Sequence, residues 1–268
     1  MGRLDRSERR RDNAMNETVS RSAPQADLAA VIGRLTVRQL LTRGRLLALG
    51  SFLVLPAFIA ALYAASDAPV APERFLARLC DGLVLTTVLP LVTLVFGGAA
   101  FSNEVEDGTL VYLVMKPVPR ATLVAAKYAA TATVSAAAVA LSVLAATVIA
   151  GQDTATLRTG AAFAVACLAG ATAYSGLFLL LGLVTTRTLV AGLAYIFLWE
   201  GVLSTLFEGL RTLSIREYTR ALAAALADLP MSVLNADLTA GGALLGIVLV
   251  AGVSAVLATY RLATIDVG

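Results

Sequence analysis

Long uncharged stretches dominate the pattern of hydrophobic and polar positions along this chain. Six of them follow one another, each about as long as the roughly 20 helical residues needed to cross a hydrocarbon layer of about 30 Å. They are residues 46–65, 82–102, 128–151, 159–185, 189–207, which Glu200 interrupts, and 241–260. Because a helix bonds its backbone polar groups internally, it is the form in which such stretches enter lipid. The pattern predicts an all-α membrane protein with six transmembrane helices.

The segment before the first stretch divides into two parts. Residues 1–25 are rich in arginine and lack apolar periodicity, which is typical of a disordered tail. Residues 26–45 have one apolar face and a neighbouring basic face: Leu28, Val31, Ile32 and Leu35, and Arg34, Arg38 and Arg45. We expect an interfacial helix here, with a cytoplasmic extension of the first span as the alternative. Residues 46–268 then form the transmembrane domain, whose first span begins too late to be a secretory signal.

The distribution of basic residues predicts the orientation of the spans. With the N-terminus in the cytoplasm, 15 of the 21 Lys and Arg residues fall on the cytoplasmic side and six on the other side. Cytoplasmic segments of membrane proteins carry this kind of positive excess. We therefore expect a multi-pass protein of the cell membrane with both termini in the cytoplasm.

Composition excludes several classes of function. Hydrophobic residues make up 58% of the chain and charged residues 15%, against about 25% charged in soluble domains. Histidine is absent, which removes the usual general base and the commonest metal ligand. Cys80 and Cys167 form no CxxC motif and are expected to be free thiols, and no phosphate-binding loop of nucleotide hydrolases occurs. We expect this chain to have no catalytic site, no metal, no bound cofactor and no nucleic-acid partner.

The connection between the second and third predicted spans carries the most distinctive pattern. Three acids, Glu104, Glu106 and Asp107, precede a short apolar segment, and Lys116 follows near its end. Negative charge at the start of a helix and positive charge at its end are the arrangement that the helix dipole favours. Pro117 and Pro119 then end the segment. The pattern predicts a short cytoplasmic helix, with a loop whose charges only set topology as the alternative.

This connection resembles the signature of type-two ABC transporter permeases. The resemblance rests on a Glu-x-Glu-x-Gly-Thr-Leu element that begins at Glu104, a Lys-Pro-x-Pro-Arg turn that begins at Lys116, and the later Lys127. The six-span layout and the flanking helices are similar to that family too, over roughly residues 26–265. The resemblance implies a coupling helix at about Glu104 to Arg120 that docks on an ATPase. The residues that it implies for coupling are Glu104, Glu106, Gly108, Thr109, Leu110, Tyr112, Leu113, Lys116, Pro117, Pro119, Arg120 and Lys127.

The resemblance also implies the partners of the chain. Two separate ABC ATPase subunits would bind ATP and Mg, and a second permease copy or a homologue would complete the pathway within the lipid bilayer. The leading hypothesis is therefore the permease subunit of an ATP-driven exporter. A secondary transporter driven by an ion gradient is the alternative, although it usually carries ionisable groups and broken helices near the midplane. An intramembrane enzyme would need a catalytic constellation that the spans do not contain.

Glu200 follows Trp199 inside the fifth predicted span, where an ionised carboxylate costs about 2.5–3.5 kcal/mol. One interpretation is a position that faces the substrate pathway or a dimer interface. The other is a structural bond to an arginine such as Arg211 or Arg216, or a protonated acid. Trp199 itself is also typical of an interfacial anchor.

A short external helix is predicted before the last span. The sequence from Ser214 to Glu217 fits a capping box, and Pro230 ends the segment. One face carries Tyr218, Leu222, Ala225 and Leu229, and the other side carries Arg216, Glu217 and Arg220. The segment is too short to cross a membrane, so we expect it to lie at the external interface, as a gate over the pathway or as a surface cover.

Overall fold

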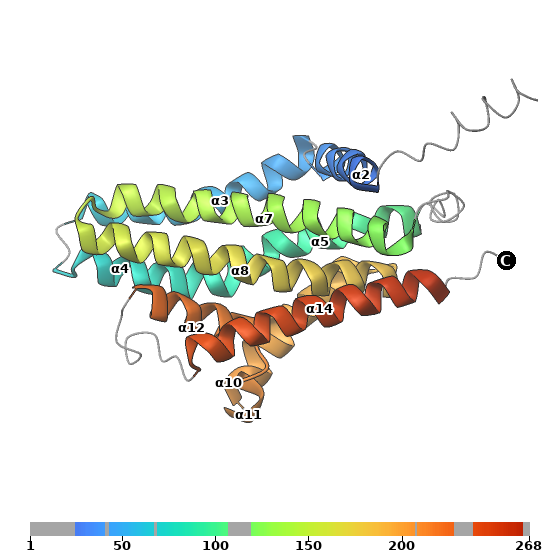
Figure 1. The fold of residues 1–268 in the computed structure, drawn as a ribbon. Helices are drawn as coiled ribbons and strands as arrows, with labels where there is room; N and C mark the ends of the chain where they lie inside the picture. Colours follow the sequence, from blue (N-terminus) through green and yellow to red (C-terminus); the bar gives the residue numbers. More distant parts are fainter. Residues whose placement is uncertain are drawn as a thin grey trace, which may run out of the picture.

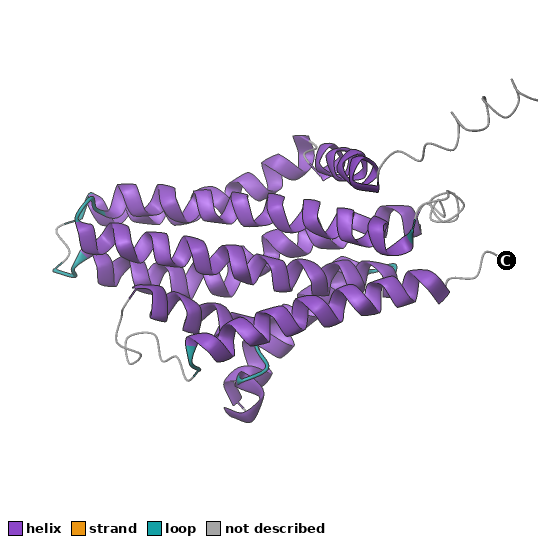
Figure 2. Cartoon of the chain, viewed as in Figure 1, coloured by secondary structure: helices purple, strands orange, loops and turns teal. Residues whose placement is uncertain are grey.

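The structure is a computed structural model that describes residues 25–40, 43–66, 69–106, 119–206, 208–227 and 238–264. Within these ranges the elements are helices and no strand occurs, which confirms the all-α prediction (Figure 2). In chain order the elements are α2 Gln25–Leu40, α3 Arg43–Ala64, α4 Pro72–Leu79, η1 Cys80–Val88, α5 Leu89–Glu106, α7 Arg120–Ala150, α8 Thr154–Val184, α9 Thr188–Ala194, η2 Tyr195–Leu203, α10 Ser204–Leu206, α11 Glu208–Arg211, α12 Ile215–Ala227 and α14 Ala240–Thr264.

Helix α8 lies at the centre of the bundle. It packs against α7, α5, α14 and α12, and in Figure 1 the long helices run side by side around it. The side chains of Phe163, Tyr174 and Phe178 on α8 are fully buried in the resulting core. Because α8 contacts several other helices, its side chains line several interfaces at once.

Small residues set the closest of these approaches. A Cβ on Gly160 would lie 2.0 Å from the Thr147 Oγ1 on α7, so only glycine fits at this point of the contact between α7 and α8. Close backbone approach through small residues is how transmembrane helices pack when the surrounding solvent is as apolar as their side chains. The glycines and alanines of the third and fourth predicted spans therefore serve helix packing.

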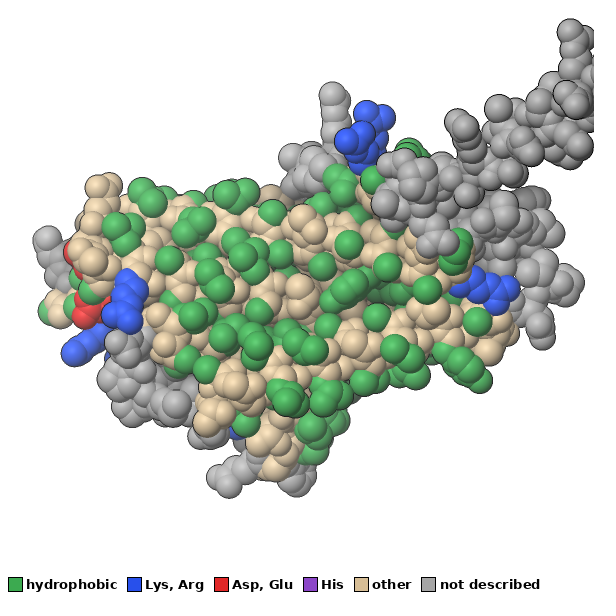
Figure 3. Space-filling model, viewed as in Figure 1, with side chains coloured by type: hydrophobic (Ala, Val, Ile, Leu, Met, Phe, Trp, Pro, Cys, Tyr) green, Lys and Arg blue, Asp and Glu red, His purple; other side chains and the backbone are tan. Residues whose placement is uncertain are grey.

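Four helices are long and apolar enough to cross a membrane: Pro72–Phe101, Arg120–Ala150, Thr154–Val184 and Ala240–Thr264. The first and fifth predicted spans correspond to shorter apolar helices, Leu49–Ala64 and Thr188–Leu203. The face in Figure 3 carries its Lys, Arg, Asp and Glu side chains near the ends of the bundle and on α2, with an apolar belt between. The membrane-spanning character is thus confirmed, whereas the count of six spans stays a prediction.

The N-terminal amphipathic helix is present as α2, although it ends at Leu40 and not near residue 45. It packs against α7 and is seen nearly end-on in Figure 1, transverse to the long helices. Leu40 is buried against the bundle, whereas Val31 and Leu35 are 54% and 55% exposed. This geometry suits a helix that lies along a membrane surface with apolar side chains free to enter lipid. The arginine-rich tail before Gln25 lies outside the described residues.

Two helical segments widen to the π form, η1 and η2. For η1 the sequence supplies a cause, because Pro90 lies two residues beyond its last residue. Proline has no N–H and its ring collides with the carbonyl four residues earlier in a regular α-helix, here that of Thr86. The wider π turn relieves that collision, and such turns are frequent at functional sites. Together α4, η1 and α5 form one continuous helix.

The bundle has two distinct ends. At one end the Arg120 guanidinium donates to the carbonyl oxygen of Ala263 at 2.5 Å, which joins the start of α7 to the end of α14. At the opposite end Asp153 caps α8 by accepting from the Thr156 N–H at 3.0 Å. That hydrogen bond lowers the pKa of the Asp153 carboxyl. We name these the Arg120 end and the Asp153 end.

Candidate functional site

Helix α12 begins where the capping pattern predicts. The Ser214 hydroxyl accepts from the Glu217 backbone N–H at 3.2 Å, as an N-cap serine does. The Glu217 carboxylate accepts from Arg211 at 3.1 Å and from Arg220 at 3.0 Å. The last turn of the predicted helix, with Leu229 and Pro230, lies outside the described residues.

Glu200 of η2 is 4% exposed and lies against the start of α12. Its Oε1 accepts from the hydroxyl of Tyr174 at 3.2 Å, the hydroxyl of Tyr195 at 3.1 Å and the backbone N–H of Ile215 at 3.1 Å. The Ser214 hydroxyl donates to its other oxygen. Glu200 therefore caps α12 from a neighbouring helix, and the carboxylate lies at a helix N-terminus, which favours negative charge.

Among the described residues, three hydroxyls and a backbone N–H bond to Glu200 where the sequence offered an arginine. Arg211 pairs with Glu217, and the Nε of Arg216 makes no hydrogen bond within the described part of the chain. Trp199 lies beside Glu200 in η2 and is half-buried. Whether either residue borders the pathway or a dimer interface stays a prediction.

A second charged group ties α12 to η1. The Arg220 guanidinium makes a bidentate contact with Asp81, with Nε–Oδ1 at 2.6 Å and Nη2–Oδ2 at 3.2 Å. Its remaining Nη1 donates to Glu217. Bidentate arginine–carboxylate pairs are among the stronger and most orienting ion pairs. Asp81, Glu217, Arg220 and Arg211 thus form one network, which we call the α12 ion network.

Two of the three charged residues on the predicted polar side of this helix are not at the surface. Glu217 is 2% exposed and Arg220 is 8% exposed, so both point into the protein. The physical reason is Asp81, which gives Arg220 a half-buried ionic partner on a neighbouring helix. Sequence reasoning missed Asp81 because the second span was taken to start at Gly82, after the charge. In the structure the helix that crosses here starts at Pro72 and includes Asp81.

The apolar side of α12 packs on α14. The ring of Tyr218 lies flat on Gly246, where a Cβ would come within 2.6–2.7 Å of three ring atoms. Leu222, one turn further on, is also buried, as the predicted apolar face requires, whereas Ala225 is exposed. Three contacts therefore hold this short helix: Glu200 at its start, Asp81 at its middle and Gly246 on its side.

This arrangement makes α12 a mechanical link between helices. Both carboxylates that hold it, Asp81 and Glu200, lie in the π-helical segments η1 and η2. Such π turns are frequent at functional sites, and α12 is bonded to both of them. We find no group of three His, Cys, Asp or Glu side chains with the geometry of a metal site among the described residues.

At the Arg120 end the structure covers only the flanks of the predicted coupling segment. Glu104 and Glu106 belong to the last turn of α5, Pro119 precedes α7, and Arg120 is its first residue. The predicted coupling positions Gly108, Thr109, Leu110, Tyr112, Leu113, Lys116 and Pro117 lie outside the described residues.

Lys127, the last residue implied for coupling, is not on the surface. It is 3% exposed, its ammonium donates to the carbonyl oxygen of Ala100 at 2.5 Å, and it lies 4.4 Å from the centre of the Phe101 ring. Lysine heads are attracted to aromatic faces in this way. Lys127 therefore fastens α7 to α5, and a partner protein has no direct access to it in this structure.

Comparison with known proteins tests the family resemblance of the chain. A comparison with characterised proteins finds no match. The model of the family described as ABC-2 family transporter protein matches residues 42–208, more than half of the chain. The match includes the first five predicted spans, the coupling segment and Glu200, and it confirms the resemblance that the sequence between Glu104 and Arg120 suggested. The chain belongs to the ABC-2 transporter family and is an ABC-2 type permease.

Proposed function

We propose that this permease forms the translocation pathway of an ATP-driven exporter and is driven by a separate ATPase. The observation that carries the proposal is the family match together with the acidic Gly-Thr-Leu and Lys-Pro-x-Pro-Arg sequence inside it. The chain has no phosphate-binding loop of its own, so the energy for transport comes from a partner. Two ATPase subunits bind ATP and Mg, and two permease chains, identical or homologous, complete the complex.

The proposed topology has six spans in the cell membrane and both termini in the cytoplasm. It is supported by the charge of the two bundle ends. Arg34, Arg38, Arg120 and Arg261 all belong to elements that meet at the Arg120 end, whereas the arginines at the Asp153 end, such as Arg74, Arg78 and Arg220, stand among the acids Glu73, Asp81, Asp153 and Glu217. An excess of positive charge is typical of the cytoplasmic side. The coupling segment, which starts and ends at the Arg120 end, then faces the ATPase.

In this proposal α12 is the external gate of the pathway. The coupling segment moves when the two ATPase subunits close, and α5 and α7 transmit that movement along the bundle. The helix that carries α5 also carries Asp81, so movement of this helix displaces α12 through Arg220. Opening of this gate would break two contacts: the ion pair of Arg220 with Asp81, and the hydrogen bonds of Glu200 at the start of α12.

Reconstitution tests the proposal directly. The purified permease is inserted into vesicles together with an ABC ATPase that co-purifies with it, and the efflux of fluorescent amphiphiles is followed with ATP, with a non-hydrolysable analogue and without nucleotide. We expect efflux only with hydrolysable ATP and only when both proteins are present. Efflux that follows an ion gradient in the absence of nucleotide would contradict the proposal and favour a secondary transporter.

A further inference from the structure

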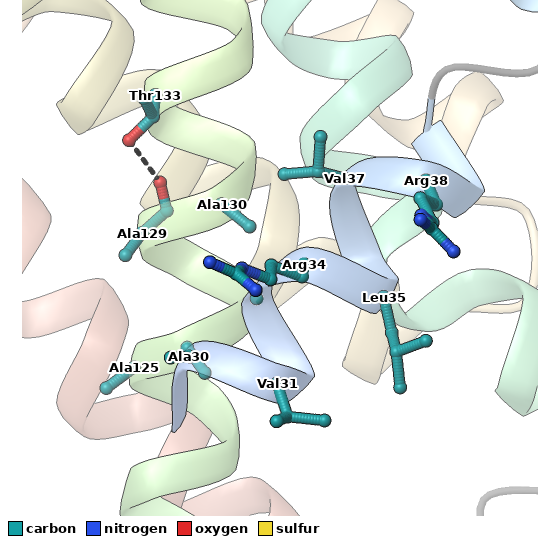
Figure 4. A pocket seen from close by; sticks show the side chains of 12 residues that line it. Ala30, Val31, Arg34, Leu35, Val37, Arg38, Ala125, Ala129, Ala130 and Thr133 are labelled. Carbon is teal, nitrogen blue, oxygen red and sulfur yellow. Dashed lines mark hydrogen bonds between the residues drawn. The ribbon is translucent and has the colours of Figure 1, made fainter. Parts of the chain in front are cut away.

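A groove of about 1060 Å³ runs between α2 and α7. Its wall on α7 consists of small side chains, Ala125, Ala126, Ala129, Ala130 and Thr133, and its wall on α2 includes Arg34 and Arg38 (Figure 4). The groove starts near the Arg120 end and follows α7 towards the apolar belt, because Thr133 lies 13 residues into that helix, about 20 Å from its start. The α2 wall thus carries two positive charges among apolar residues, and the α7 wall is nearly all alanine.

The two arginines have no partner in the described part of the chain. Both are exposed, they stand four residues apart on one side of α2, and no acidic residue is among the described residues that line the groove. In Figure 4 the Arg34 guanidinium reaches towards Ala129 and Ala130, and Arg38 lies one turn further along α2. A guanidinium presents a planar fork of donors that matches the oxygens of a phosphate.

The apolar wall suits a hydrocarbon chain. Ala125 and Ala129 are exposed on α7, and the Thr133 hydroxyl is already bonded to the Ala129 carbonyl oxygen at 2.7 Å, so it offers the groove little polarity. Val31 and Leu35 extend from α2 beside the groove and are more than half exposed. A molecule with a negative head and an apolar tail would satisfy the arginines and cover the alanines at the same time.

We propose that this groove binds an anionic phospholipid of the surrounding bilayer. The phosphate contacts Arg34 and Arg38, and one acyl chain lies along the alanine wall of α7. Because α2 and α7 both contribute, the bound lipid fastens the interfacial helix to the bundle at the Arg120 end. The site is independent of the ATPase partner and would exist in a permease without one.

Native mass spectrometry of the full purified chain tests the site. The protein in neutral detergent is titrated with phosphatidylglycerol, with phosphatidylcholine and with inorganic phosphate, and bound molecules are counted. We expect one tightly bound phosphatidylglycerol per chain, little phosphatidylcholine and no retained phosphate. Arg34→Gln and Arg38→Gln should each weaken phosphatidylglycerol binding about fivefold, since one basic residue near a membrane surface contributes about 1 kcal/mol.

A second pair of variants separates a groove from a merely basic surface. Ala129→Leu fills the alanine wall without a change of charge and should also lose the tight lipid. Ala137→Leu, at an exposed position of α7 beyond the groove, should keep it. Arg74→Gln with Arg78→Gln removes two arginines from α4 at the other end and should have no effect. Unchanged binding in Ala129→Leu, or in the Arg34→Gln and Arg38→Gln variants, would overturn the proposal.

Discussion

Glu200→Ala is expected to release α12 and to destabilise the protein by about 2–4 kcal/mol. The substitution leaves two tyrosine hydroxyls, the Ser214 hydroxyl and the Ile215 N–H without their acceptor in a buried site. A buried group that loses its partner costs about 1–3 kcal/mol, while hydrogen bonds in membrane proteins average about 0.6 kcal/mol each, so four lost contacts give a value in this range. Trp199, the only tryptophan of the chain, lies next to the site and reports the change by its fluorescence.

The amide variant distinguishes hydrogen bonding from charge. In Glu200→Gln the remaining oxygen can accept from Tyr174, Tyr195 and Ile215, and the new amide can donate to Ser214 Oγ, so we expect a loss below about 1 kcal/mol. Glu73→Ala, on α4 at the same end of the bundle, is the matched control. Thermal unfolding of the three variants decides the matter: an alanine variant as stable as the parent, or a glutamine variant as weak as alanine, would refute this account of the cluster.

Tyr112→Ala with Leu113→Ala is expected to uncouple the permease from its ATPase. In the proposed complex these apolar side chains enter a cleft of the partner, where aromatic anchors carry much of the binding energy. Loss of an anchor worth about 2 kcal/mol lowers the affinity about 30-fold. We expect the ATPase to be lost during co-purification and ATP hydrolysis to fall to the rate of the isolated ATPase.

The control for this pair must keep the permease folded. Leu213→Ala removes an exposed leucine just before α12, far along the chain from the coupling segment, and should leave hydrolysis unchanged. Arg120 is a poor choice for such a test, because its contact with Ala263 also holds α7 to α14. Normal co-purification and hydrolysis in the Tyr112 and Leu113 variant would mean that the segment does not drive the permease.

Much of the fold follows from the sequence because lipid imposes a simple rule. A stretch without charge and about 20 residues long has to be helical, and the helices α7, α8 and α14 start and end within about eight residues of the uncharged stretches that predicted them. The start of α12 was also predictable, since Ser214 supplies a cap for a local helix. These features are determined by residues that are close together in the sequence.

The contacts of the site could not be predicted, because they join residues far apart in the chain. Asp81 and Arg220 are separated by 139 positions, and each residue considered alone is expected to be exposed to water. Their pairing inside the bundle reverses the expected exposure of the α12 face. Lys127 is a similar case, because its partner, the carbonyl oxygen of Ala100, belongs to the backbone of another helix and leaves no trace in the side-chain pattern.

The account depends most on which side of the membrane the coupling segment faces, and thiol labelling measures this. Cys80 and Cys167 are fully buried, so a membrane-impermeant maleimide should leave the parent chain unlabelled. Gly108→Cys and Gln152→Cys place one new thiol in the coupling segment and one beside the Asp153 end. In intact cells we expect label only on Gln152→Cys, and in inside-out vesicles only on Gly108→Cys. Label on Gly108→Cys in intact cells would contradict the account.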